Sequence, residues 1–234
     1  MAALLAFGLS LSTSAPAVAE VSARCRVPDV YVALPADLKR TERLIDRERP
    51  VKLLVLGPSI GGPGVLPEQR RTRLHQELSK RLPAVKFEFV DDGPPSGLAQ
   101  NDFNNLRAAV SSGEPDLVLW QVGAPDALAM ADPEEFGRTL KDAADWLKAR
   151  NVDFILIDPP FAPSVRHEKL YWRIVGKIRE VSDRAGLNLF RRYAAMQYLE
   201  FERQKLREEP ADAGSRRVCM SELVAEAIVR AVTR

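Results

Sequence analysis

A buried strand that runs into a glycine-rich turn most constrains how this chain folds. Residues 51–64 have the sequence VKLLVLGPSIGGPG, in which an apolar run of strand length ends in turn residues. Such a run is typical of a strand buried on both faces of a parallel sheet. Four of the eight residues from Gly57 to Gly64 are glycine, which adopts backbone angles closed to other residues. The turn can therefore bend sharply and bring its backbone close to a ligand, with Ser59 inside the bend.

Strands and helices alternate along the rest of the chain. Apolar or alternating patterns predict further strands at Val85–Val90, Leu117–Val122, Val152–Ile157 and Leu187–Phe190. Amphipathic spacing predicts helices at Asp37–Arg49, Pro67–Arg81 and Leu98–Val110, and another after a cap at Asp132. Three more are predicted from His167 to a stop at Gly186, at Arg191–Glu208 and after Ser215. This alternation predicts an α/β, three-layer flavodoxin-like fold with a mostly parallel five-stranded sheet. We expect strand order 2-1-3-4-5, which places the ligand crevice beyond the first and third strands.

Size and charge narrow the class of protein. The chain has 234 residues, 46% of them apolar, which is enough to bury one sizeable core. Its formal net charge of +2 and the absence of a clustered basic face argue against a nucleic-acid partner. Beyond the N-terminus no apolar run is long enough to span a membrane. The loop with four glycines lacks the lysine of a phosphate-binding P-loop, so a nucleotide site is not expected.

The N-terminus has features of an export signal. Ala2–Leu11 is an apolar stretch of suitable length, and Ala17-Val18-Ala19 before Glu20 is a small-residue cleavage site. A basic segment before the apolar stretch is missing, and the alternative is a disordered or helical N-terminus. We expect a signal peptide at 1–19, an N-terminal extension and helix at 20–50, and one domain at 51–234, in a periplasmic or secreted protein.

The chain has two cysteines, Cys25 and Cys219. In an oxidising compartment they would form a disulfide that closes a long loop and stabilises the fold by roughly 4 to 5 kcal/mol. The alternative is two unpaired thiols. Two cysteines without metal-ligand spacing argue against a zinc site, and we expect no metal. Asp91 and Asp92 suggest a cation site only weakly, because acidic residues are common in solvated loops.

Several segments together resemble the SGNH (GDSL-type) hydrolases. Gly57-Pro58-Ser59 is similar to the Gly-Asp-Ser block of that family, and Gly123-Ala124-Pro125 is similar to its Gly-x-Asn block. The segments PDLVLWQVG, FILIDPPFAP and VCMSELVAEAI are similar to exported bacterial members, so the resemblance covers most of the chain after the predicted signal peptide.

The resemblance implies hydrolysis of acyl or acetyl esters without a cofactor. In that family a serine attacks the ester carbonyl, backbone N–H groups and an asparagine hold the oxyanion, and an Asp-x-x-His pair before the last helix supplies the base. Ser59 matches the nucleophile, and Gly97 or Gly93 matches the oxyanion glycine. A small ester, or an envelope carbohydrate or lipid, is the implied ligand.

The match to the family is partial. Pro125 stands where the family has the asparagine, Ala211 where it has the histidine, and Glu208 where it has the aspartate. Loss of one oxyanion donor costs about 100- to 1000-fold in rate, and loss of the base in a serine triad costs about a million-fold. We therefore expect an ester hydrolase with a degraded site that is slow or inactive. The alternative is a non-catalytic binding module in the periplasm.

Two other residues are candidates to replace the missing groups. His167 opens the helix after the fourth strand and is a candidate base, with a solvated helix N-terminus as the alternative. Asp126 follows Pro125 and is a candidate to hydrogen-bond Ser59, with a turn or cap residue as the alternative. Ser59 itself has an alternative role as the cap of the following helix.

Overall fold

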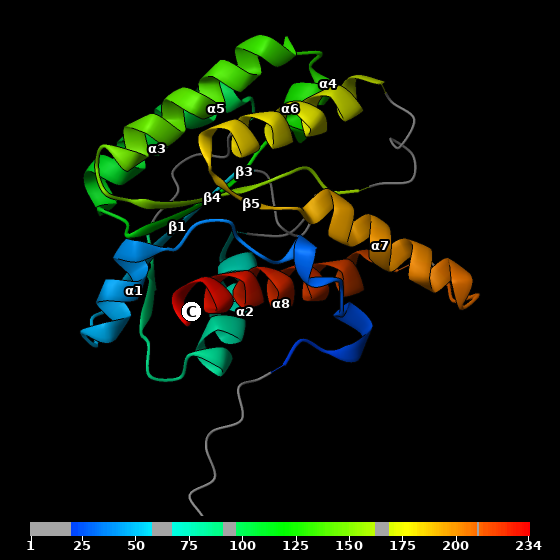
Figure 1. Ribbon diagram of the computed structural model, residues 1–234, viewed down its shortest axis with the longest axis horizontal. Helices are drawn as coiled ribbons and strands as arrows, with labels where there is room; N and C mark the ends of the chain where they lie inside the picture. Colours follow the sequence, from blue (N-terminus) through cyan, green and yellow to red (C-terminus); the bar gives the residue numbers. More distant parts are fainter. Residues whose placement is uncertain (1–19, 58–66, 91–96, 162–168, 210) are drawn as a thin grey trace, which may run out of the picture.

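A single parallel sheet forms the centre of the molecule. The computed structural model describes residues 20–57, 67–90, 97–161, 169–209 and 211–234 (Figure 1). The strands are β1 (Val51–Leu56), β2 (Phe87–Phe89), β3 (Leu117–Gln121), β4 (Asp153–Ile157) and β5 (Asn188–Phe190). Their order is β2-β1-β3-β4-β5, and every neighbouring pair is parallel. The predicted fold class and strand order are confirmed.

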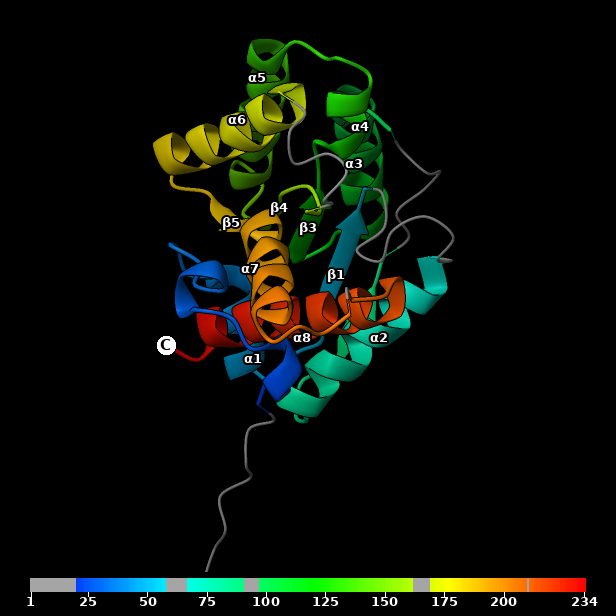
Figure 2. The same ribbon diagram turned by 90° about the vertical axis from the view of Figure 1, so that its right-hand side faces the viewer.

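Helices cover both faces of the sheet, as Figure 1 and Figure 2 show. The helices on one face are α1 (Lys39–Asp46), α2 (Pro67–Arg81) and α8 (Ala213–Val232), and those on the other are α3 (Ala99–Gly113), α5 (Pro133–Lys148) and α6 (Lys169–Ala185). β1 and β3 are buried on both faces because their side chains alternate between the two resulting cores, with Leu53 and Leu119 in one and Leu54 and Trp120 in the other. This explains the continuous apolar run in β1.

Two further helices follow strand ends. α4 (Ala124–Leu128) comes directly after β3, and α7 (Arg192–Lys205) directly after β5. Since all five strands are parallel, both helices start at the same edge of the sheet as the turn after β1. That edge is where open α/β sheets bind ligands.

The segment 20–38, which we name the N-terminal strap, is fastened to α8. It includes the short helical turns Ala23–Cys25 and Asp29–Tyr31. Cys25 and Cys219 form the expected disulfide. The Ser22 N–H donates to Glu222 Oε2 at 2.8 Å, and Arg230 pairs with Asp29 at 2.6 Å.

Some boundaries differ from the sequence-based expectation. After β3 the chain forms the short helix α4, capped by Gly123, with Pro125 in its first turn, where a missing N–H costs nothing. α8 begins at Ala213 rather than after Ser215, because Asp212 caps it by accepting the Ser215 N–H at 2.8 Å. Within the described ranges, no helix is long and apolar enough to cross a membrane.

Candidate active site

The turn after β1 begins in contact with the end of β3. Gly57 has a φ of +97°, and a Cβ atom there would lie 2.1 Å from the backbone oxygen of Gln121. Only glycine can occupy this position without displacing the neighbouring backbone. β1 therefore ends directly beside the last residue of β3. Ser59 lies outside the described residues.

The turn after β3 is constrained in the same way. Gly123 has a φ of +93°, and a Cβ atom there would lie 2.9 Å from side-chain atoms of Ile174 and Ile178 in α6. α4 starts at the next residue. Pro125, the position matched to the oxyanion asparagine, is in the first turn of α4 and has no side-chain donor.

Asp126 joins α4 to the start of α3. Its side chain is 3% exposed, and its Oδ1 accepts the backbone N–H of Ala99 at 2.9 Å. Ala99 is the first residue of α3, whose own cap residue Leu98 makes no side-chain cap bond. Burial raises the pKa of Asp126, while the Ala99 N–H opposes the rise. Asp126 thus caps a helix, as its alternative interpretation expected, although the helix belongs to another segment.

The same hydrogen bond fixes the start of α3, which follows the candidate oxyanion glycine Gly97. Gly97, exposed, lies two residues before Ala99, and a Cβ atom at Gly97 would meet no atom within 4 Å. Gly97 and Leu98 therefore lead into α3 at the point where its first residue contacts α4. The second candidate, Gly93, is outside the described residues.

The positions matched to the catalytic histidine and aspartate hold an alanine and an exposed, ion-paired glutamate. Glu208 is exposed, and its Oε2 lies 3.4 Å from Nη1 of Arg203 in α7. Ala211 is half-buried and borders a small cavity between α7 and α8. In the part of the chain that the structure describes, the only histidine is His75, which is exposed on α2 and lies 6.0 Å from the ring of Phe89. His167, the candidate substitute, lies outside that part.

A buried polar network at the same edge was not predicted. Arg192, at the start of α7, donates from Nε to the backbone oxygen of Asp158 at 2.8 Å and from Nη1 to Gln121 Oε1 at 2.7 Å. Asp158 Oδ1 accepts the Tyr193 N–H at 2.7 Å. Burial raises the pKa of Asp158 to about 7, against the opposing effects of the Tyr193 N–H and the Arg192 guanidinium. The network connects the ends of β3 and β4 to α7, and its member Gln121 also contacts Gly57 through its backbone.

The described residues offer no obvious metal site. Among them, no group of three histidine, cysteine or acidic side chains could hold a metal ion. Asp91 and Asp92 are not among the described residues. Both cysteines are in the disulfide.

Comparison with known proteins gives one family and several similar folds. The model of the Non-GDSL lipase-like family matches residues 24–234. A catalytic mutant of Axe2, an acetylxylan esterase from Geobacillus stearothermophilus, is 16% identical with a TM-score of 0.59, over 79% of this chain and 94% of that one. LAE5, an α/β hydrolase from the metagenome of Lake Arreo, is 22% identical with a TM-score of 0.58, over 78% and 94% of the two chains. At these identities the similarity shows the fold. No curated protein matches the chain.

Proposed function

Since the chain belongs to the Non-GDSL lipase-like family of SGNH-type hydrolases, we propose that it is a serine ester hydrolase with a degraded catalytic site. Ser59 is its nucleophile, and acyl or acetyl esters are its substrates. Gly97 or Gly93 contributes a backbone N–H to the oxyanion. His167 and Asp126 are the candidate groups for acid–base work. Hydrolysis is far slower than in a complete serine hydrolase.

The proposal depends mainly on the residue that stands at the position of the catalytic histidine. Ala211 has no titratable group, and the neighbouring Glu208 pairs with Arg203 on the solvent side of α7. A serine hydroxyl without a base is a poor nucleophile at neutral pH. Asp126 already accepts the Ala99 N–H, so one of its two oxygens is engaged in helix capping.

The same observations support the alternative, a non-catalytic binding module. Glu208 and Asp126 both serve structural contacts, and Pro125 contributes to the start of α4. Gly57 and Gly123 still have the positive φ angles, +97° and +93°, with which the chain leaves β1 and β3. A protein that binds an ester without cleaving it would keep the crevice and lose the base.

For location, we propose cleavage after Ala19 and a place in the periplasm or outside the cell, with 20–50 as an extension to a domain at 51–234. The Cys25–Cys219 disulfide supports this because disulfides persist in oxidising compartments. Peptide sequencing of the protein recovered from the periplasm of a bacterial host tests it. An intact N-terminus in the cytoplasmic fraction would contradict it.

Labelling with a fluorophosphonate separates the hydrolase from the binding module. The reagent modifies an activated serine, and peptide mapping locates the adduct. We expect slow modification at Ser59 that Ser59→Ala abolishes. A folded protein that is never modified would favour the binding module instead. Rapid modification would show that another residue acts as the base in place of the histidine.

A further inference from the structure

A pair of buried hydrogen bonds from one arginine fixes the side chain at the end of β3. Arg192 donates from Nη1 to Gln121 Oε1 at 2.7 Å and from Nε to the backbone oxygen of Asp158 at 2.8 Å. Gln121 is the last residue of β3 and is fully buried, and Arg192 is 3% exposed. Because its oxygen accepts from Arg192, the amide of Gln121 is held in one orientation.

Stability alone does not explain an amide at this position. Nε2 of Gln121 is buried and has no hydrogen-bond acceptor within the part of the chain that the structure describes. A buried donor without an acceptor is costly, and such groups are rare in native structures. An apolar side chain would fill the same space without that cost. What the amide adds is the acceptor that ties β3 to α7 through Arg192.

The fixed side chain lies against the end of β1. Leu56 pairs with Trp120 in the parallel register of β1 and β3, so the next residues, Gly57 and Gln121, stand opposite each other. A Cβ atom at Gly57 would lie 2.1 Å from the backbone oxygen of Gln121 and 3.1 Å from its Cβ. Close-packed groups transmit displacements to one another. A shift of Gln121 therefore moves Gly57.

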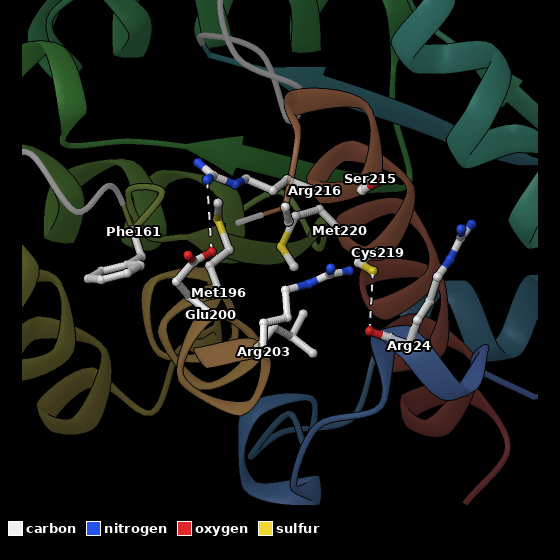
Figure 3. Close-up of a pocket in the computed structure, with 11 residues that line it drawn as sticks. Arg24, Phe161, Met196, Glu200, Arg203, Ser215, Arg216, Cys219 and Met220 are labelled. Atoms are coloured by element: carbon white, nitrogen blue, oxygen red, sulfur yellow. Dashed lines mark hydrogen bonds and ion pairs between the residues drawn. The ribbon is translucent and has the colours of Figure 1, made fainter. Parts of the chain in front are cut away.

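α7 is a rigid support for Arg192, because it is held both to the sheet and to α8. At its first turn, the Tyr193 N–H donates to Asp158 Oδ1 at 2.7 Å. Further along, Glu200 of α7 points toward Arg216 of α8, as Figure 3 shows, with 3.8 Å between Oε2 and Nη2. The guanidinium that holds Gln121 thus comes from a helix that is fastened at two places.

We propose that Gln121, anchored by Arg192, is a positioning residue for the candidate nucleophile. Ser59 follows Gly57 by two residues, and two residues span at most about 7 Å, so the place of Gly57 limits where Ser59 can lie. Gln121 and Arg192 act through Gly57 and do not touch the substrate. The inference rests on the proposed function, because it requires Ser59 to be the nucleophile.

The test uses a parent protein in which hydrolysis is fast enough to measure kcat and KM separately. This parent is Pro125→Asn/Glu208→Asp/Ala211→His, which returns the family residues to their matched positions, and the substrate is p-nitrophenyl acetate. A displacement of about 1 Å costs about 100-fold in rate, so we expect Gln121→Leu to lower kcat of the parent by about that factor and to change KM little. Gln121→Glu keeps an acceptor for Arg192 and should retain most of kcat.

Leu119→Val is the matched control for general loss of stability. Leu119 lies two residues before Gln121 on the same face of β3 and is buried in the core there. It makes no contribution to the link with Arg192. We expect Leu119→Val to lower the urea midpoint of the parent and to leave kcat unchanged.

The possible failures of the inference and of the proposed function are distinguishable. If Gln121→Leu keeps the kcat of the parent, or if Leu119→Val loses as much kcat as Gln121→Leu, Gln121 has a structural role only and the inference is overturned while the hydrolase stands. A parent that is folded by circular dichroism but shows no hydrolysis dependent on Ser59 would contradict the proposed function, and the inference with it.

Discussion

The carboxylate of Asp126 caps a helix that begins 27 residues earlier in the chain, by accepting the Ala99 N–H at 2.9 Å. This bond holds the loop before α3 against the helix that follows β3. The start of α3 and the start of α4 therefore lie side by side, and a single buried acid connects them.

Removal of this cap should loosen the start of α3. In Asp126→Ala the Ala99 N–H loses its acceptor, and we expect its hydrogen exchange to accelerate about tenfold, since the bond is charge-assisted. Asp126→Asn retains an acceptor oxygen and should exchange nearly as slowly as the wild type. Amide exchange followed by NMR at Ala99 measures both, and equal exchange in the alanine variant would contradict the capping role.

The glycines on the two sides of the crevice should respond differently to substitution. Gly57→Ala places a Cβ atom 2.1 Å from the Gln121 oxygen at a φ of +97°, which should destabilise the fold by roughly 2 kcal/mol or more. Gly97→Ala meets no atom within 4 Å, and its effect should stay within about 0.5 kcal/mol. Urea unfolding of both variants makes the comparison. Similar losses in both would refute the close contact at Gly57.

We expect the titration of Asp158 to lower the free energy of unfolding as the pH rises. Its pKa in the folded protein, about 7, is above the ordinary aspartate value of 3.8. The folded state therefore holds the proton more tightly, and the resulting stabilisation is complete below about pH 3.8 and is lost between there and pH 7. Asp158→Asn should remove this slope, because asparagine does not titrate and still accepts the Tyr193 N–H.

The measurement is the free energy of unfolding in urea between pH 4 and pH 8. The difference between wild type and Asp158→Asn should shift by a few kcal/mol across that range, in the direction that weakens the wild type at higher pH. Asp142→Asn, at an exposed position on α5, is the control for general charge effects. Parallel curves for wild type and Asp158→Asn would show that Asp158 does not titrate in this range.

Reduction of the disulfide should cost considerable stability. Cys25 and Cys219 are 194 residues apart, and the chain-entropy model gives about 5 kcal/mol for so long a loop. We expect dithiothreitol to lower the urea midpoint of the wild type and to leave Cys25→Ser/Cys219→Ser unchanged. A wild-type midpoint that is insensitive to the reductant, with both thiols confirmed as free, would contradict this.

Local sequence patterns were sufficient to predict where the strands of the sheet and several helices lie. β1 was predicted at its observed residues because both of its faces are buried and its apolar run is continuous. α5 was predicted from Asp132, whose side chain accepts the Glu134 and Glu135 N–H groups. Each of these signals lies within one segment of the chain.

The contacts that build the site connect distant segments and leave no local pattern. Arg192 follows a strand beside another arginine, which resembles a solvated pair, yet it is 3% exposed and bonded to Gln121, 71 residues away. The helix α3 was itself predicted, but its cap Asp126 lies 27 residues away and leaves no local pattern. The Asp158-Pro159-Pro160 strand end was the only sequence signal near the network. Ser59, Gly93 and His167 remain predictions.

Restoring the missing catalytic groups tests the central claim most directly. The variant Pro125→Asn/Glu208→Asp/Ala211→His returns the family residues to their matched positions. The measurement is its rate of p-nitrophenyl acetate hydrolysis against the wild type, with Ser59→Ala in both backgrounds. We predict a gain of at least about 100-fold that disappears with Ser59→Ala. A folded variant with no gain, or a wild type that already hydrolyses the ester efficiently through Ser59, would contradict the degraded site.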